Sequence, residues 1–300
     1  MSLAVECRNV TKRYRDVEAV KGVSFTMEDG KIYGVLGRNG AGKTTLMHLL
    51  TGQLLPDEGE IRIGGVFPFE NRDCLNRICF IKESQRYVKH LTVSQTLDLA
   101  KAVFPNWDQR FAERLVQDFG LPMRRKIKHL SRGMESAVGI VIGLASRAPI
   151  TLFDEPYLGL DAVGRNLFYE RLLEDYTEHP RTVILSTHLI DEVSKLFEQV
   201  MIIHQGQLLL NEEAERLRES AFTVSGNSEA VERFVVGKRV LHTETIGSNR
   251  IAAVYGSCTE EERRQAAAAG MEVGPLPLQK LFIYLTEKGA DAQWEVKSRR

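Results

Sequence analysis

The sequence has few cysteine features of a secreted, disulfide-bonded protein or of a protein stabilised by structural zinc. Its cysteines form no CxxC pair, and none has a histidine at metal-ligand spacing. We therefore expect buried or incidental thiols in a reducing compartment, with neither a disulfide framework nor a zinc site. The four cysteines are Cys7, Cys74, Cys79 and Cys258.

Long hydrophobic runs and a targeting segment are also missing. The most apolar window, residues 137–145, is about half of the ~20 residues that a membrane span needs. Residues 1–6 have neither the basic nor the apolar region of a signal peptide. The sequence thus predicts a cytoplasmic protein whose role at a membrane would need a partner chain.

Neither sign of charge is in excess. Forty basic and forty acidic residues cancel, so no global field draws the chain to nucleic acid, and no nucleic-acid partner is expected. With 300 residues and 43% hydrophobic content, the chain can bury one large core or two smaller ones.

The first two thirds of the chain alternate short apolar runs with helical stretches. Residues 32–36, 150–153 and 182–186 are almost wholly apolar, which is typical of buried parallel strands. Residues 93–146 have helical spacing and no comparable strand. This predicts an α/β core with a helical lobe at about residues 86–146.

The pattern changes after about residue 219, and we place a domain boundary there, between residues 1–218 and 219–300. Short candidate strands and helices then alternate, which predicts a small α+β domain without a recognisable chemical motif. The candidate strands are 221–225, 239–246, 251–255 and 271–273, and the candidate helices are 228–235, 259–269 and 278–287.

Residues 37–44 match the phosphate-binding pattern GxxxxGK[ST] in full. The glycines allow backbone N–H groups to surround phosphate oxygens, and the helix that follows points its positive end at the same charge. In this pattern Lys43 reaches the β- and γ-phosphates of a nucleoside triphosphate, and the Thr44 hydroxyl ligates Mg²⁺.

Acidic and imidazole groups follow two of the predicted strands. Asp154 and Glu155 end the strand at 150–153, where a solvated acidic loop is the alternative. Beside a phosphate loop, Asp154 is expected to order Mg²⁺ and Glu155 to polarise the attacking water. His188 is either an ordinary surface histidine or, at the carboxyl end of a parallel strand, part of the same site.

Two further segments complete the pattern. Leu130-Ser131-Arg132-Gly133-Met134 lies between the phosphate loop and the acidic strand end, and Tyr14 lies between strand-like segments. Tyr14 is either plain surface or a platform for a purine ring. In this order the motifs resemble those of the nucleotide-binding subunit of an ATP-binding cassette (ABC) transporter, over roughly residues 3–210.

The resemblance implies a P-loop NTPase fold, with a RecA-like core and an inserted helical subdomain. It also implies ATP and Mg²⁺ as cofactors and head-to-tail pairing with a second ABC subunit. Ser131 and Gly133 would then contact the γ-phosphate held by the partner's Lys43, and Asp161 would couple the two sites. The implied ATP-binding residues are Tyr14, Gly37, Arg38, Asn39, Gly40, Ala41, Gly42, Lys43, Thr44, Thr45, Glu83, Ser131, Gly133 and Asp161. Lys43, Glu155 and His188 would be catalytic, and Thr44, Asp154 and Glu83 would hold Mg²⁺.

The chain departs from the family pattern at two places. The usual signature is LSGGQ, whereas Arg132 and Met134 occupy its third and fifth positions. The position of the usual Q-loop glutamine falls on Glu83, with Gln85 two residues later. Either Glu83 substitutes for it or Gln85 moves in.

We interpret the sequence as an ATPase subunit that drives a separate integral membrane permease, with export the favoured direction. It would sit peripherally on the inner face of the cell membrane, in a homo- or heterodimer. One alternative is an ABC ATPase that works without a permease. Another is a regulatory cassette that hydrolyses ATP weakly.

Overall fold

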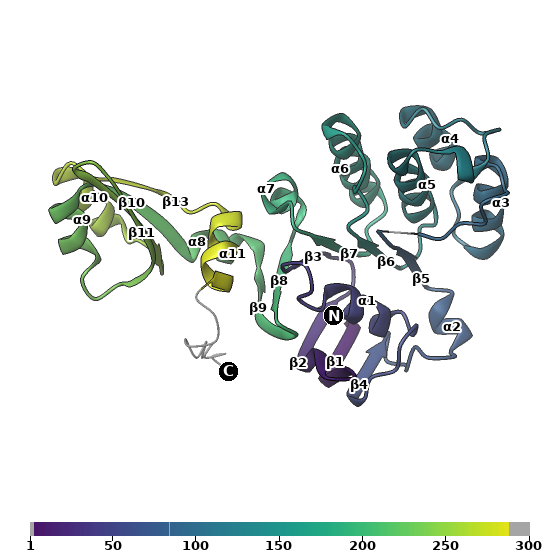
Figure 1. Cartoon of the computed structure of the whole chain (residues 1–300), viewed down its shortest axis with the longest axis horizontal. Helices are drawn as coiled ribbons and strands as arrows, with labels where there is room; N and C mark the ends of the chain where they lie inside the picture. The colour runs from purple at the N-terminus through teal and green to yellow at the C-terminus, as the bar shows by residue number, and fades with distance from the viewer. Residues whose placement is uncertain (1–2, 84, 288–300) are drawn as a thin grey trace. The chain divides into compact units, whose positions relative to one another are not determined.

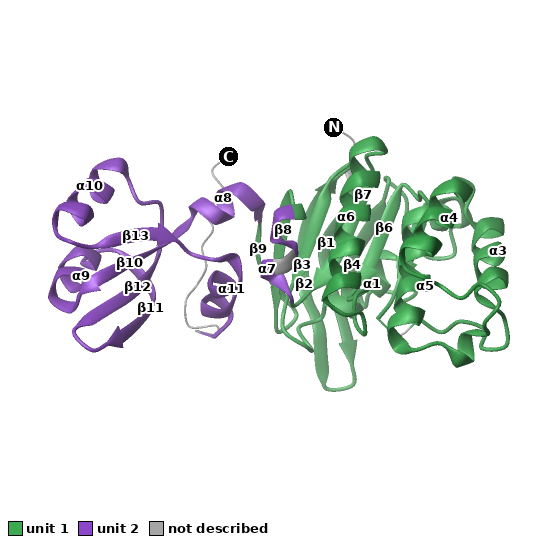
Figure 2. Cartoon of the chain, turned by 90° about the horizontal axis from the view of Figure 1, so that it is seen from above, with its two compact units in different colours: residues 1–188, 196–211 green, residues 189–195, 212–300 purple. Residues whose placement is uncertain are grey.

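The computed structural model describes residues 3–83 and 85–287. Within that part, the chain forms two compact units, which we call unit 1 and unit 2 (Figure 2). Unit 1 is made of residues up to 188 together with 196–211. Unit 2 is made of residues 189–195 and those from 212 onward. The predicted boundary at residue 218 lies close to this division, but residues 189–195 were not expected to join unit 2.

Unit 1 is built on a six-stranded sheet in the order β5-β6-β7-β3-β8-β9 (Figure 1). The pairs β5/β6, β6/β7, β7/β3 and β3/β8 are all parallel, as the apolar runs predicted. β8 and β9 are joined by a turn at Gln205 and Gly206, both with positive φ, which is the conformation of a type I′ turn. The strands are β3 (Ile32–Leu36), β5 (Ile78–Ile81), β6 (Ile150–Asp154), β7 (Thr182–Thr187), β8 (Gln199–His204) and β9 (Gln207–Glu213).

A second, antiparallel sheet has the order β2-β1-β4. Helix α1 lies between the two sheets, and its leucines and methionine join side chains of both in one core. The elements concerned are β1 (Leu3–Tyr14), β2 (Val17–Glu28), α1 (Lys43–Leu50) and β4 (Glu58–Ile63). The core therefore fixes the start of α1, where the phosphate loop ends.

Three helices and a short 3₁₀ turn form the helical lobe. Helix α5 is its longest member, and every residue from 137 to 145 is buried, which accounts for the apolar window in the sequence. Asp108 caps α4 and Ser131 caps α5. The bounds are α3 (Val93–Val103), α4 (Gln109–Asp118), η1 (Ile127–His129) and α5 (Arg132–Ala145).

On the sheet face opposite α1, α5 packs against β5, β6 and the long helix α6 (Ala162–Glu178). The ring of Phe153 on β6 meets the ring of Phe168 on α6, with centroids 5.3 Å apart. The short helix α2 (Arg72–Leu75) precedes β5. The sheet is thus covered on both faces, as buried parallel strands require.

Unit 2 contains a four-stranded antiparallel sheet in the order β11-β12-β10-β13. Helices α9 and α10 contribute Val231 and Ala266 to its own small core. The strands are β10 (Ala221–Asn227), β11 (Arg239–Ile246), β12 (Asn249–Tyr255) and β13 (Glu272–Pro275). The helices are α7 (Ile190–Val193), η2 (Ser194–Leu196, which ends in unit 1), α8 (Ala214–Glu219), α9 (Ser228–Val235), α10 (Glu260–Ala268) and α11 (Leu278–Glu287).

No helix in the described ranges, 3–83 and 85–287, has the length and apolar character required to span a bilayer.

Candidate functional site

The phosphate loop follows β3 directly and leads into α1. Gly40 and Gly42 have φ of +80° and +106°, a region that glycine enters without the strain a Cβ causes. A Cβ on Gly42 would also lie 2.3 Å from the carbonyl oxygen of Ala19. The loop therefore needs glycine at this position for its backbone path and for its close contact with β2.

Lys43 is buried at the first position of α1. Its Nζ donates to the carbonyl oxygen of Gly37 at 2.7 Å and lies 3.8 Å from Oε1 of Glu155. The ammonium group is thus held inside the loop, between the backbone and an acidic side chain. This is the place that the sequence predicted for a phosphate-binding lysine.

Thr44 and Asp154 come together although 110 positions separate them. The Thr44 hydroxyl donates to Oδ2 of Asp154 at 2.6 Å, and the Ser186 hydroxyl donates to Oδ1 at 2.5 Å. The strand register explains the meeting, because β7 lies between β3 and β6 in the parallel sheet. An aligned hydroxyl and carboxylate are a donor set that suits Mg²⁺, which usually takes one or two protein oxygens and completes its shell with water and phosphate. Among the described residues there is no group of three or more His, Cys, Asp or Glu side chains placed to hold a metal by themselves.

Glu155 follows Asp154 with a φ of +50°, a conformation that costs a non-glycine residue about 1–3 kcal/mol. Its N–H donates to the Ser186 hydroxyl at 3.1 Å. Its Oε2 accepts a hydrogen bond from the Tyr157 hydroxyl at 2.6 Å and lies 2.7 Å from Nδ1 of His188. An ionised carboxylate only accepts, so this Nδ1 carries the proton. Oε1 is buried and has no hydrogen-bond partner among the described residues.

Ser186 and Tyr157 were not predicted as site residues. Both depend on which side chains the β6/β7 register brings together, and the sequence shows only that the two strands are apolar. Tyr157 could have been noticed as a polar aromatic residue two positions after Glu155. Burial, and then the nearby charge of Glu155, raise the pKa of its phenol, so the hydroxyl stays protonated and remains a donor.

The signature segment lies at the start of α5. Ser131 is exposed, and its hydroxyl caps α5 by accepting from the N–H of Met134 at 3.3 Å. A Cβ on Gly133 would lie 2.4 Å from the carbonyl oxygen of Gly159. The Ser136 hydroxyl donates to the carbonyl oxygen of Leu158 at 2.6 Å. The signature segment is therefore packed against the loop between β6 and α6.

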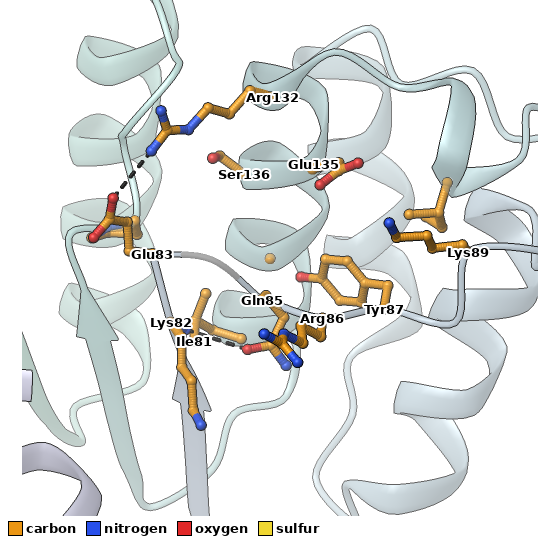
Figure 3. A pocket seen from close by; sticks show the side chains of 13 residues that line it. Ile81, Lys82, Glu83, Gln85, Arg86, Tyr87, Lys89, Arg132, Glu135 and Ser136 are labelled. Carbon is orange, nitrogen blue, oxygen red and sulfur yellow. Dashed lines mark hydrogen bonds and ion pairs between the residues drawn. The ribbon is translucent and has the colours of Figure 1, made fainter.

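The two residues that depart from the family pattern contact each other. Nη2 of Arg132 lies 3.0 Å from Oε1 of Glu83, at one side of a cavity of about 640 Å³ (Figure 3). Gln85 lines the same cavity, and its Oε1 accepts from the N–H of Lys82 at 3.4 Å. Within the described ranges, neither Glu83 nor Gln85 forms a hydrogen bond or ion pair with Thr44 or Asp154. The assignment of Glu83 to Mg²⁺ stays a prediction.

The remaining predicted residues lie around this centre. Asp161 caps α6 by accepting from the N–H of Gly164 at 2.8 Å. Tyr14 is exposed at the end of β1 and pairs with Val17 of β2, the strand whose Ala19 contacts the phosphate loop. Three loop residues, Arg38, Asn39 and Gly40, are exposed, whereas Ala41 is buried and Thr45 is half-buried.

A glycine-rich loop between a parallel strand and a helix, with a lysine, a threonine and an acidic strand end beside it, defines a P-loop nucleoside-triphosphatase. Comparison with known proteins narrows the class further. A model of the family "ABC transporter" matches residues 20–158. The chain belongs to this family, as an ATP-binding subunit of a transporter and a member of the ABC ATPases.

Relatives and solved structures agree with that assignment. The bacitracin transport ATP-binding protein BcrA of Bacillus licheniformis is 31% identical over 212 residues, covering 70% of this chain and 69% of BcrA. The Nod factor export ATP-binding protein I of Burkholderia lata is 29% identical over 297 residues, covering 94% and 96% of the two chains. A solved ATP-binding subunit of an ABC transporter has 25% identity and a TM-score of 0.65, covering 72% of this chain and 92% of that one.

Proposed function

We propose that this protein hydrolyses ATP as one of two paired cassettes and so powers export through a separate membrane permease. It would bind the inner face of the cell membrane through that permease. The observation that carries the proposal is the constellation of Lys43, Thr44–Asp154 and Glu155–His188 at one edge of a parallel sheet. Each side chain has the chemistry that one part of phosphoryl transfer needs.

The proposed roles follow from these contacts. The Lys43 ammonium would bind the β- and γ-phosphates from inside the loop. Thr44 and Asp154 would hold Mg²⁺, which supplies charge neutralisation to the triphosphate. Glu155 would polarise the attacking water, and His188 would contact the γ-phosphate or that water. The purine ring of ATP would stack on the exposed ring of Tyr14.

Pairing is proposed from the polar groups that the signature segment exposes. Ser131 and Arg132 are exposed at the N-terminus of α5, a helix of 14 residues. A helix N-terminus with a hydroxyl and a guanidinium is suited to a triphosphate presented by a second subunit. Ser131 and Gly133 would complete the partner's site, and Asp161 would couple the two sites.

Export through a permease is proposed from the relatives. Their names describe bacitracin transport and Nod factor export, and the second of these relatives matches nearly the whole chain, unit 2 included. The neighbouring reading frame offers a quick check, because a permease would appear there as a protein with several apolar spans.

The test is ATP hydrolysis with Mg²⁺ by the purified protein, alone and together with the co-expressed permease in liposomes. We expect turnover that the permease stimulates, and movement of a substrate out of the compartment that holds the cassettes. Lys43→Ala should abolish both. Absence of hydrolysis in both preparations would refute the proposal. Hydrolysis without any associated permease would leave an ABC ATPase and remove the transport role.

A further inference from the structure

Tyr157 has an unusual position for a buried aromatic residue of the core. It is 1% exposed and lies two residues after Glu155, yet its hydroxyl is hydrogen-bonded to functional groups. The hydroxyl donates to Oε2 of Glu155 at 2.6 Å and is also hydrogen-bonded to the Thr187 hydroxyl. Since a phenol has one hydrogen, and Glu155 takes it, Thr187 is the donor in the second bond.

These bonds act on one oxygen of the carboxylate only. Oε2 of Glu155 is shared by Tyr157 and Nδ1 of His188, whereas Oε1 has no hydrogen-bond partner among the described residues. Oε1 faces the Lys43 ammonium at 3.8 Å, longer than a direct hydrogen-bonded ion pair. The two oxygens of Glu155 therefore differ: Oε2 is held by hydrogen bonds, whereas Oε1 is buried and has no hydrogen-bond partner among the described residues.

We propose that Tyr157 is a positioning residue for ATP hydrolysis: its hydroxyl anchors Oε2 of Glu155 and so keeps Oε1 for the attacking water. The inference rests on the proposed role of Glu155. As the water oxygen bonds to the γ-phosphorus and the bond to the bridging oxygen of ADP breaks, Oε1 takes the proton that the water gives up.

The geometry also indicates what the anchor prevents. A glutamate side chain turns about several bonds, and the opposite charge of Lys43 is close in a buried, low-dielectric place. Without the phenol, the carboxylate would be drawn onto the ammonium, and Lys43 would then use the oxygen that the water needs. His188 alone is a weaker anchor, because its side chain is 45% exposed whereas the ring of Tyr157 is packed in the core.

The experiment is Tyr157→Phe in the full-length protein, with kcat and KM for ATP measured separately. We expect kcat to fall about tenfold or more, with KM changed less than about twofold, because the anchor acts on the reacting oxygen and not on ATP binding.

A matched control is Tyr176→Phe. Tyr176 is also in unit 1, and its hydroxyl is likewise bonded to a carboxylate, that of Glu198. It also donates to the carbonyl oxygen of Gly30, which precedes β3, whereas the phosphate loop follows β3. We expect its kcat and KM to match the wild type. If Tyr157→Phe is too unstable to assay, 3-fluorotyrosine at position 157 is the second variant. Its more acidic phenol is a stronger donor to Oε2, so kcat should change while KM stays within about twofold, and an unchanged kcat would overturn the positioning role.

Two outcomes separate this inference from the proposed function. If Glu155→Gln stops turnover while Tyr157→Phe keeps the wild-type kcat, the positioning role is wrong and the proposed function stands. If Glu155→Gln itself turns over normally, Glu155 is not the base, and both fail.

Discussion

Among the single residues, Gly133 is required by the packing of the protein, separately from any role in nucleotide binding. It lies in the first turn of α5, where the carbonyl oxygen of Gly159 would be 2.4 Å from an added Cβ. That neighbour is backbone, so it cannot swing aside as a flexible side chain would. The signature glycine thus keeps α5 close to the loop that contains Leu158 and Gly159.

Gly133→Ala is expected to destabilise unit 1 by about 1–3 kcal/mol, the usual range for overpacking. Alanine is favoured over glycine in helices by up to about 1 kcal/mol, so a net loss would identify the steric conflict. Urea denaturation measures the change. Gly164→Ala is the control, because its Cβ would meet side-chain atoms and no backbone, with the Asp161 carboxylate at 3.3 Å and Leu160 at 3.5 Å. Equal stability of the two variants would contradict this account of Gly133.

The candidate residues that local spacing identifies are ones that the structure brings together. Lys43, Thr44, Asp154 and Glu155 were found because a loop pattern and a strand end place them. The contacts of Arg132 with Glu83 could not be predicted in this way. The two residues are 49 positions apart. In the sequence each departs from the family pattern at a different motif, and nothing there indicates that their side chains meet.

At the scale of elements, the loop after β5 and the start of α5 are joined by that ion pair (Figure 3). The side chains of Arg132 and Glu83 are 65% and 46% exposed, so water and salt screen their attraction. Helix α5 is also linked to a different loop, the one between β6 and α6, by the shorter, half-buried bond from Ser136 to the carbonyl oxygen of Leu158. The exposed pair can therefore break at small cost, whereas the Ser136 contact holds α5 in place.

A double-mutant cycle with Arg132→Ala and Glu83→Ala should give a coupling energy below about 1 kcal/mol, as is usual for exposed ion pairs. Thermal or urea unfolding measures it at low and at high salt. We expect the coupling to shrink as salt increases. A value of several kcal/mol that salt does not change would mean that the pair is effectively buried, contrary to the structure.

The elements themselves were predicted well where the pattern is local. α9, β11 and α11 have the bounds that were expected from the sequence, and β3 and β6 agree within a residue. The order of the strands could not be predicted from the sequence, because it depends on pairings between distant segments, such as β3 with β7. The antiparallel sheet was not predicted either, since its long strands β1 and β2 contain several register shifts that break the two-residue alternation.

At the scale of the whole molecule, unit 2 includes a segment that directly follows a site residue. Residues 189–195 belong to unit 2, and α7 starts at Ile190, two positions after His188 (Figure 2). Within unit 2, α7 contacts α11, and the N–H of Gln279 donates to Oδ1 of Asp191 at 3.4 Å. The helix that begins two positions after His188 is therefore packed within unit 2.

Leu281→Ala is expected to cost unit 2 about 2–5 kcal/mol, because this α11 side chain is 1% exposed and its loss leaves a cavity. We also expect a lower rate of ATP hydrolysis, since the loosened contact reaches α7 and the chain next to His188. Lys280→Ala, at an exposed position of the same helix, should change stability by less than about 0.5 kcal/mol. A destabilised Leu281→Ala with the full wild-type rate would show that unit 2 does not influence the site.

The role of Glu155 as the base in ATP hydrolysis is measured most directly on Glu155→Gln, with Mg²⁺ and ATP. The amide keeps the shape of the side chain but cannot accept the proton of the attacking water. We expect turnover to fall by about a hundredfold or more, and ATP to stay bound and hold two subunits together as a dimer in size-exclusion chromatography with light scattering. Glu178→Gln, at an exposed position of α6, should behave as the wild type. Normal turnover in Glu155→Gln would mean that Glu155 does not accept the proton of the attacking water.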